Sequence, residues 1–470
     1  MLQFILNDTE IKAAIPPGLP LLDFVRYHQH LTGTKIGCRE GDCGACTMLV
    51  GDIIDGKLIY QSATSCLMAS GQAHGKHIVT IEGLNLEALN VIQEAFAQEG
   101  ASQCGFCTPG FIVSLAGYAI SGKESNQDNA REYINGNICR CTGYKSIERA
   151  AERLNEVLQS NSTKHPVEFA IEAGIIPAYF ADIKQKLDVI KSNLPLLPVN
   201  PGAKMLGGGT DLYVQQHEGM VEADISFMWT KENLDSITVT GNRMTIGGAI
   251  TVTSLASHPV FQKAFPHWSS YIELVSSTPI RNMATIAGNF TNASPIGDFT
   301  IFFLALDAGL QLHGTNGMRE ISLRSFYKGY KQLEKKADEH IESISFDLPS
   351  ATTKFNFEKV SKRTWLDIAS VNSAICINMD GDTIASASIS AGGVGPIPMF
   401  LPKASAVLEG KSFTPALLET CIDTAQQEIS PISDARGTSD YKRLLLSQLI
   451  RAHAMKLFPE ISVEKLLHAS

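Results

Sequence analysis

The feature that most constrains this chain is a short stretch in which three cysteines alternate with glycines. The cysteines are spaced C-x4-C-x2-C, and a fourth cysteine follows further along the chain. Four thiolates with this spacing predict a [2Fe–2S] cluster of the plant type. The glycines let the loop turn tightly, so that backbone amides can approach the sulfurs. The predicted ligands are Cys38, Cys43, Cys46 and Cys66, and the glycines are Gly37, Gly41 and Gly44.

Other uses of four cysteines fit this stretch less well. Ten cysteines in 470 residues are sparse for a disulfide scaffold, and the first residues lack the pattern of a secretory leader. A Rieske site would need two histidine ligands, but the sequence contains no Cys-x-His pair. A structural zinc site is the strongest alternative to a [2Fe–2S] cluster, because four-cysteine zinc sites are common. The x4 gap and the glycines favour iron.

Length and composition indicate an ordinary globular protein of about three domains. Hydrophobic residues make up 44% of the chain, and the net charge of −9 without a basic run argues against nucleic acid as a partner. No apolar run reaches the roughly 18 to 20 residues that a membrane span requires. We therefore expect a soluble, cytoplasmic protein that binds no membrane.

A second group of four cysteines precedes two predicted helices. A C-x2-C pair lies just ahead of a helix with a predicted cap at Thr108 and Pro109 in its first turn. A C-x-C pair precedes another helix with one apolar face. Taken alone, this group suits zinc as well as iron, but beside the first site a second [2Fe–2S] cluster makes sense as an electron relay. Its predicted ligands are Cys104, Cys107, Cys139 and Cys141, whereas Cys376 and Cys421 belong to no spaced group and are expected to pack in a core.

Changes in periodicity divide the chain into several domains. Residues 1–83 indicate short strands with one helix, as in a β-grasp, ferredoxin-like domain. Residues 84–158 indicate an all-α domain whose first helix is predicted to align Leu89, Ile92 and Phe96 on one face. Residues 159–177 are polar and contain proline, which predicts a linker. Residues 178–350 and 351–470 mix strands with helices, so the predicted fold class is multidomain α+β.

Two polar, glycine-rich stretches in the third domain are candidates for contact with a cofactor. Gly207, Gly208 and Gly209 follow a short strand, where exposed amides can cradle a diphosphate. This loop matches neither G-x-G-x-x-G nor the Walker pattern, so by itself a tight turn explains it better. Residues 277–298 carry small hydroxyl and amide side chains that suit a polar cofactor, with an exposed loop as the alternative.

Together these segments resemble the iron–sulfur and flavin half of the xanthine dehydrogenase family over nearly the whole chain. A chain that carries both cluster modules and the flavin domain resembles the small subunit of the family's split bacterial members. The motifs that carry the resemblance, in the family's order, are Gly-Cys-Arg-Glu-Gly-Asp-Cys-Gly-Ala-Cys, Gln-Cys-Gly-Phe-Cys-Thr-Pro-Gly, Gly-Asn-Ile-Cys-Arg-Cys-Thr-Gly-Tyr, Gly-Gly-Gly-Thr-Asp-Leu and Ile-Arg-Asn-Met-Ala-Thr-Ile-Ala-Gly-Asn.

The resemblance implies FAD in a two-part α+β domain over residues 178–350, followed by a C-terminal domain of the CO dehydrogenase flavoprotein type. The implied flavin-site residues are Lys204, Met205, Leu206, Gly207, Gly208, Gly209, Thr210 and Asp211 along the diphosphate, then Thr285, Asn289 and Asp298, with Ser294 beside them. Departures from the family's animal members are Gly209 for asparagine, Asp211 for glutamate, Val275 for a phenylalanine near the flavin and Ser370 for a lysine.

The resemblance also implies an electron-transfer role without a catalytic residue on this chain. Electrons from a molybdenum centre would pass through two [2Fe–2S] clusters to FAD and then to NAD, as hypoxanthine and xanthine are oxidised to urate. Molybdopterin would lie only on a large partner subunit, in a heterodimer or a dimer of heterodimers. The alternatives are the same subunit of another molybdenum hydroxylase, acting on an aldehyde, carbon monoxide or an N-heterocycle, and a non-catalytic iron–sulfur flavoprotein.

Overall fold

The computed structural model describes residues 1–161, 163–195, 197, 202–231 and 234–460. Residue 162 of the predicted linker and residues 461–470 of the predicted C-terminal domain lie outside the described residues. The chain forms two compact units: Met1–Thr230 with Ser277–Ala284, and Lys231–Ser276 with Thr285–Ser470. No helix among the described residues combines the length and the apolar character needed to cross a bilayer.

The first unit begins with a five-stranded sheet that matches the predicted ferredoxin-like domain. Its strand order is β2-β1-β5-β3-β4, and β1 pairs antiparallel with β2 but parallel with β5. The one helix expected in residues 1–83 is a short α1, which starts at Leu21 and continues into a π-helical turn over Phe24–His28. The strands and helix are β1 (Leu2–Leu6), β2 (Thr9–Ala13), α1 (Leu21–Asp23), β3 (Thr47–Ile54), β4 (Lys57–Thr64) and β5 (His77–Val79).

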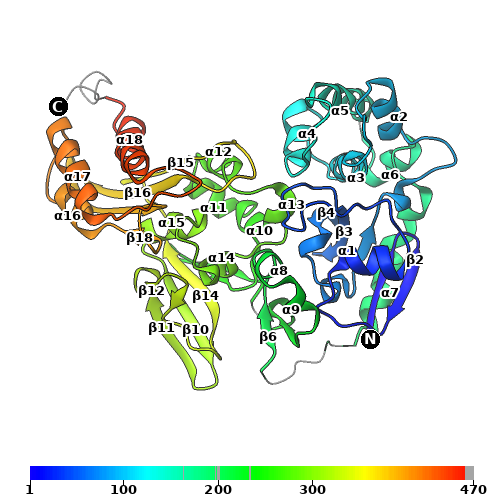
Figure 1. Cartoon of the computed structure of the whole chain (residues 1–470), viewed down its shortest axis with the longest axis horizontal. Coiled ribbons are helices and arrows are strands. Elements are labelled where there is room, and N and C mark those ends of the chain that lie inside the picture. The colour runs from blue at the N-terminus through cyan, green and yellow to red at the C-terminus, as the bar shows by residue number, and fades with distance from the viewer. Residues whose placement is uncertain (162, 196, 198–201, 232–233, 461–470) are drawn as a thin grey trace. The chain divides into compact units, whose positions relative to one another are not determined.

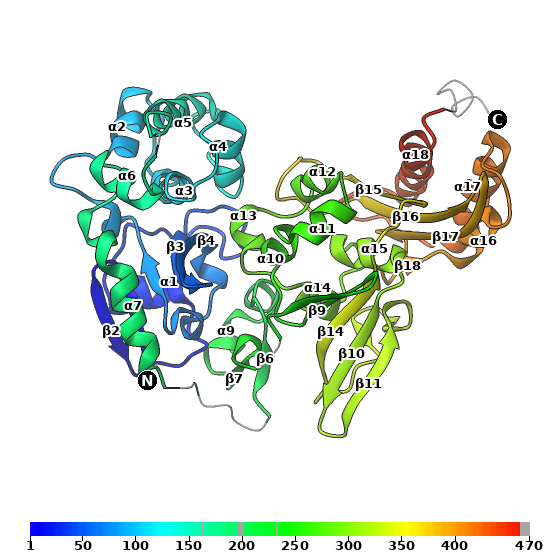
Figure 2. The same ribbon diagram turned by 180° about the vertical axis from the view of Figure 1, so that it is seen from behind.

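Helices follow the sheet, and the first of them starts later than its apolar pattern predicts. Asn90 caps it by accepting a hydrogen bond from the Gln93 amide, so Leu89 lies before the helix and its side chain is exposed. The predicted cap at Thr108 is also wrong, because Thr108 is already helical and Cys107 occupies the cap position. Figure 2 shows α3 beside β3 and β4. The helices are α2 (Val91–Gln98), α3 (Thr108–Ala119), α4 (Gln127–Ile134) and α5 (Lys145–Leu158).

The segment predicted as a linker contains a helix, α6 (Pro166–Glu172). Ala170, Ile175 and Ile176 are buried in the same core as the helices before it, so the second half of the segment packs against the all-α domain. The next helix is α7 (Ile183–Ser192), whose Ile183 packs in a cluster with Ile5 of the sheet. α7, which can be followed in Figure 2, packs against the sheet at β1 and β3. The rest of the unit consists of β6 (Lys204–Leu206), α8 (Leu212–Gln215), α9 (His217–Val221), β7 (Ile225–Phe227) and α13 (Thr278–Arg281).

The second unit contains a sheet in the order β11-β10-β14-β9-β8. β8 and β9 form a hairpin that turns at Gly241 and Asn242. A β-bulge interrupts the pairing of β10 with β14 between Gln311 and Leu312. The elements up to Leu333 and the last strand of this sheet are β8 (Ile237–Thr240), β9 (Arg243–Gly247), α10 (Val252–Ala256), α11 (Pro259–Ala264), α12 (Trp268–Glu273), α14 (Ile286–Asn292), α15 (Asp298–Ala305), β10 (Gly309–Gly314), β11 (Gly317–Ser322), β12 (Tyr327–Gly329), β13 (Gln332–Leu333) and β14 (His340–Asp347).

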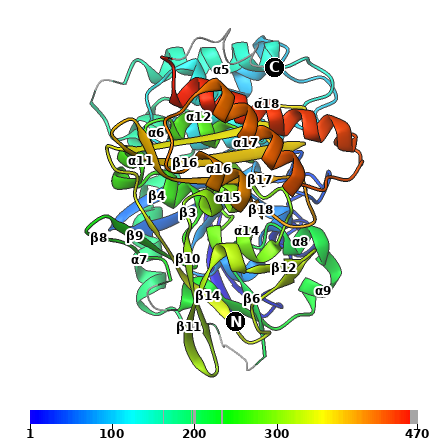
Figure 3. The same cartoon turned by 90° about the vertical axis from the view of Figure 1, so that its left-hand side faces the viewer.

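A second sheet, β15-β16-β17-β18, forms the C-terminal part of this unit and confirms the predicted alternation of strands and helices. Three helices cover it, and they share one hydrophobic core with β16 and β17. Figures 1 and 3 show these helices lying along the strands. The elements are β15 (Thr353–Val360), β16 (Val371–Asp380), β17 (Thr383–Gly392), β18 (Met399–Phe400), α16 (Pro402–Leu408), α17 (Pro415–Glu428) and α18 (Ser439–Leu457).

Candidate iron–sulfur and flavin sites

The first four predicted ligands lie together in the ferredoxin-like domain as two pairs of sulfurs. The Cys38 and Cys43 sulfurs each accept a backbone hydrogen bond from the other residue, both at 3.4 Å. The Cys46 and Cys66 sulfurs lie 3.4 Å apart. A side chain in place of Gly37 would meet the Cys43 sulfur at 2.6 Å, which explains why the loop needs glycine there.

Backbone amides point at these sulfurs, as the glycine-rich sequence predicts. The Glu40 amide donates to the Cys38 sulfur at 3.3 Å. The hydrogen bond from the Cys43 thiol lowers the pKa of Cys38 to about 5. A lowered pKa favours the thiolate, which is the form that binds iron. Arg39 in this loop is paired with Asp23 through a 2.7 Å ion pair.

The second four cysteines also lie in two pairs, at the loops before α3 and α5. Cys104 is hydrogen-bonded with Cys141, and Cys107 with Cys139. The Cys139 sulfur accepts hydrogen bonds from the amides of Cys141 and Thr142, both at 3.4 Å. Cys104 and Cys141 are exposed, whereas Cys46 and Cys66 of the first group are buried.

The paired arrangement fits a two-iron cluster better than a single zinc ion. One zinc ion would bring all four sulfurs of a group to about 3.8 Å from one another, the edge of a tetrahedron with Zn–S bonds of about 2.3 Å. In the part of the chain that the structure describes, no three of the eight sulfurs lie within 4.8 Å of one another. Two pairs in each group suit two irons with two cysteines each.

The two cysteine loops are joined by hydrogen bonds. The Ile138 amide, next to Cys139, donates to the carbonyl oxygen of Cys43 at 3.0 Å. The buried Asn137 side chain donates to the Gly44 carbonyl at 3.0 Å and accepts from Ser114 at 2.7 Å. A side chain at Gly44 would meet the Gly136 carbonyl at 2.2 Å, so glycine permits this contact. Sequence reasoning assigned no role to Asn137, although it lies inside the Gly-Asn-Ile-Cys motif.

The glycine loop follows β6 in the first unit and has the features of an anion cradle. Among the described residues, the amides of Gly208, Gly209 and Thr210 have no protein acceptor. The Gly208 carbonyl accepts a hydrogen bond from Gln72 at 3.3 Å, and a side chain at Gly208 would meet the Met283 carbonyl at 2.0 Å. Free amides in a tight glycine turn fit a diphosphate.

The other predicted diphosphate residues flank this cradle. The Lys204 amine donates to Gln216 at 3.1 Å, Met205 is half-buried, and Leu206 is buried in the first unit's core. The Asp211 carbonyl accepts from the Gln215 amide in the first turn of α8.

The polar stretch of the second unit lies around the start of α14 and the turn into α15. Thr285 caps α14 by accepting from the Gly288 amide at 3.0 Å, and the Asn289 side-chain oxygen accepts from the Thr300 amide at 3.2 Å. The Ser294 carbonyl accepts from Gly297 in the turn between the helices. The structure thus brings Thr285, Asn289, Ser294 and Asp298 into one helix–turn–helix segment.

Asp298 forms an ion pair that sequence reasoning missed. The Lys359 amine lies 2.7 Å from its carboxylate, and the Asn372 amide donates to the other oxygen at 2.6 Å. The Lys359 side chain is fully buried and also donates to two backbone carbonyls, those of Leu274 and Asp367. No motif surrounds Lys359, so only its contacts reveal this role.

Two of the four residues that depart from the animal pattern, Val275 and Ser370, are buried in the second unit. Val275 precedes the segment of α13, and the Ser370 hydroxyl donates to the Arg436 carbonyl at 3.0 Å. The ungrouped cysteines behave as expected for core residues, because burial raises the pKa of Cys376 and of Cys421 to about 12. Neither is therefore a thiolate at neutral pH.

Four protein-family models match the chain one after another. They are the 2Fe-2S iron-sulfur cluster binding domain at residues 4–70, the [2Fe-2S] binding domain at 80–152, the FAD binding domain in molybdopterin dehydrogenase at 181–349, and the CO dehydrogenase flavoprotein C-terminal domain at 357–457. These matches confirm the predicted multidomain α+β fold and its cofactors, two [2Fe–2S] clusters and FAD.

Similar proteins extend the comparison. The chain is 28% identical to a xanthine dehydrogenase of Emericella nidulans, over 91% of this chain and 36% of that protein. It is 27% identical to xanthine dehydrogenase 1 of Arabidopsis thaliana, over 91% of this chain and 37% of that protein. The chain therefore spans about a third of the length of these relatives.

A solved structure shares the fold of more than half of the chain. It is a carbon monoxide dehydrogenase from Hydrogenophaga pseudoflava that lacks the Mo-pyranopterin moiety of the molybdenum cofactor, with a TM-score of 0.52 and 24% identity over 56% of this chain and 92% of that chain. The chain thus combines two [2Fe–2S] cluster-binding domains with an FAD-binding domain of the kind found in molybdopterin dehydrogenases and a C-terminal domain of the CO dehydrogenase flavoprotein type.

Proposed function

We propose that this chain is the electron-transfer subunit of a xanthine dehydrogenase. When bound, its two [2Fe–2S] clusters and FAD would supply a route for electrons from a molybdenum centre on a partner subunit to NAD, during oxidation of hypoxanthine and xanthine to urate. The proposed cluster ligands are the two cysteine groups described above. The proposed FAD contacts are residues 204–211 with Val275, Thr285, Asn289, Ser294, Asp298 and Ser370.

One observation carries the electron-transfer proposal: the hydrogen bond from Ile138 to the Cys43 carbonyl. It connects the residue before one proposed ligand, Cys139, directly to another proposed ligand in the other group. The Asn137 side chain joins the same two loops through a second hydrogen bond, which it donates to the Gly44 carbonyl. A close, rigid connection between the two ligand loops suits a relay, because electrons then cross only a short, well-ordered stretch of backbone.

The exposure of the second cysteine group supports contact with a partner. Cys104 and Cys141 are exposed, and the nearby Phe106 and Tyr144 side chains are 46% and 39% exposed. Large apolar side chains around exposed ligands are typical of an interaction site. The first group is more enclosed, so the second group is the proposed entry point, next to a molybdopterin-binding subunit in a heterodimer or a dimer of heterodimers.

The substrate proposal comes from the relatives. Both curated relatives quoted above are named xanthine dehydrogenases, whereas the solved structure is a carbon monoxide dehydrogenase. The match to the xanthine dehydrogenase of Emericella nidulans covers 91% of this chain, whereas the match to the carbon monoxide dehydrogenase structure covers 56%. Xanthine is therefore the first substrate to test, and carbon monoxide, aldehydes and N-heterocycles are the comparison substrates.

The test uses the chain alone and in complex with its molybdenum-binding partner. Alone, with its cofactors bound, the protein should reduce an artificial dye with NADH but should not reduce NAD with xanthine. In the complex, xanthine should drive NAD reduction. Turnover with a comparison substrate but not with xanthine would overturn the xanthine assignment, and xanthine-dependent NAD reduction by the isolated chain would overturn the division between two subunits.

A variant of the second cysteine group separates the two halves of the route. Cys104→Ser in the complex should abolish xanthine-to-NAD turnover, because the break lies on the substrate side of the flavin. The same variant should retain NADH-to-dye activity within about twofold of the parent. Equal loss of both activities would contradict the proposed order of the cofactors.

A further inference from the structure

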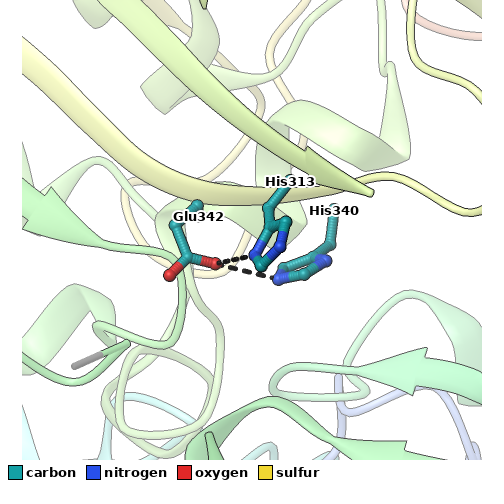
Figure 4. Close-up of side chains that lie close together, drawn as sticks. All are labelled: His313, His340 and Glu342. Atoms are coloured by element: carbon teal, nitrogen blue, oxygen red, sulfur yellow. Dashed lines mark hydrogen bonds and ion pairs between the residues drawn. The ribbon is translucent and has the colours of Figure 1, made fainter. Parts of the chain in front are cut away.

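Three potential metal ligands lie together on the second unit, far along the sequence from either cysteine group. His313 is on β10, and His340 and Glu342 are on the neighbouring strand β14. Figure 4 shows the two imidazole rings and the carboxylate pointing toward one another. Among the described residues, these are the only three His, Cys, Asp or Glu side chains whose ligand atoms all lie within 4.8 Å of one another.

The β-bulge in this sheet brings the three side chains to one place. His313 lies directly opposite His340, and Leu312 lies opposite Ile341, but Gln311 pairs with Ser343. Glu342 is therefore the extra residue of the bulge. Bulges redirect side chains and are common near functional sites. The bulge here takes Glu342 out of the regular cross-strand pairing, and its carboxylate lies within hydrogen-bond distance of both histidines.

The distances match the edges of a metal coordination polyhedron. The Glu342 Oε2 atom lies 3.0 Å from His340 Nε2 and 3.4 Å from His313 Nδ1. Ligand bonds of about 2.1 Å to a tetrahedral zinc ion place neighbouring ligand atoms about 3.4 Å apart. Both Glu–His distances are thus close to this length, and all three ligand atoms lie within 4.8 Å of one another.

We propose that His313, His340 and Glu342 form a binding site for a divalent first-row transition metal ion, with Zn²⁺ as the expected occupant. Two imidazoles and one carboxylate are a ligand set that zinc uses, with water in the remaining position. The ligands differ in exposure: the His340 side chain is 9% exposed, Glu342 21% and His313 42%. His340 anchors the site, and His313 leaves it open to solvent.

The ligand chemistry also sets selectivity. Mg²⁺ and Ca²⁺ prefer oxygen ligands, and this site offers two nitrogens and one carboxylate group. A bound transition metal would tie β10 to β14 across the bulge, where the ladder of the sheet is interrupted. The site is thus expected to strengthen the second unit, independently of the cysteine groups and of the flavin residues.

The test measures zinc binding by the cofactor-loaded full chain. The cysteine groups must contain their full complement of iron, because empty thiolate sites also bind zinc. Isothermal titration with ZnCl₂ should show one site in the micromolar range or tighter, and anomalous diffraction at the zinc edge should place the ion between the three side chains. Zinc should also raise the temperature of unfolding, whereas MgCl₂ should not.

Two variants and a matched control decide the assignment. His313→Gln and Glu342→Gln should each weaken zinc binding at least tenfold and remove the thermal shift; Glu342→Gln keeps the size of the side chain and removes its charge. His267→Gln, at an exposed histidine of the same unit, should bind zinc like the parent. Equal zinc affinity in the parent and both variants, or no binding by the parent, would overturn the proposal and leave only a His–Glu hydrogen-bond network.

Discussion

At the scale of single residues, the pairing of the eight cysteines is the most informative feature. Each group contains two close pairs instead of one compact set of four. Since each iron of a two-iron cluster takes two cysteines, the loss of any single ligand removes one of the four bonds that hold its cluster. The two groups use separate sulfurs, so each can be disrupted without the other.

We predict that Cys43→Ser removes one [2Fe–2S] signal in electron paramagnetic resonance and Cys139→Ser removes the other. The reduced protein should show two distinguishable signals before mutation and about half of the iron after each change. Cys376→Ser is the control, because this thiol lies in β16 outside both groups. Stoichiometric zinc in place of iron at the second group, or loss of both signals in Cys139→Ser alone, would contradict this assignment.

At the scale of elements, the loop after β6 depends on a close contact with another segment of the first unit. The Gly208 α-carbon faces the carbonyl of Met283 and the α-carbon of Ala284. A glycine there serves the packing of the loop as well as its free amides. A side chain at Gly208 would first meet the protein backbone at Met283.

We predict that Gly208→Ala lowers FAD content at least tenfold and leaves both cluster signals intact. The added methyl group would lie 2.0 Å from the Met283 oxygen, so the loop must move, at a cost of about 1–3 kcal/mol. Gly219→Ala in α9 is the matched control, because a methyl group there meets nothing within 4 Å. FAD content, measured by absorbance after heat release, should be unchanged in the control. Full FAD content in Gly208→Ala would contradict the placement.

At the scale of the whole molecule, each unit contains a buried neutral histidine. His77 lies in the first unit, where it is hydrogen-bonded with Tyr60 and with the Asn7 carbonyl. His453 of α18 lies in the second unit and is hydrogen-bonded with Asn356 of β15 at 2.8 Å. Burial lowers the pKa of each histidine to about 4.

We predict that both units lose stability as the pH falls from about 6.5 to about 4. In this window the unfolded chain binds a proton at each histidine and the folded chain does not, so the free energy of unfolding decreases with falling pH. The loss is at most roughly 3 kcal/mol per histidine, at 1.36 kcal/mol per pKa unit. Urea unfolding measured across this range, with the parent and His453→Gln, checks the prediction. A variant with the same pH slope as the parent would show that His453 does not contribute.

The sequence alone determined which residues form the cysteine groups, the glycine loop and most of the regular elements. Such features depend on spacing along the chain, as in C-x4-C-x2-C, the C-x2-C and C-x-C pairs, and the run of three glycines. Local chemistry is enough to predict them, because the atoms involved are close in the sequence.

Only the tertiary structure decided how these residues are combined. It divided each cysteine group into pairs, joined Asn137 to Gly44, and placed α6 within the core where a linker was expected. It also brought His313 beside His340 and Glu342 and buried Lys359 against Asp298. The physical reason is that these contacts join residues distant along the chain, and whether such residues meet depends on strand register, bulges and packing, which no local pattern encodes.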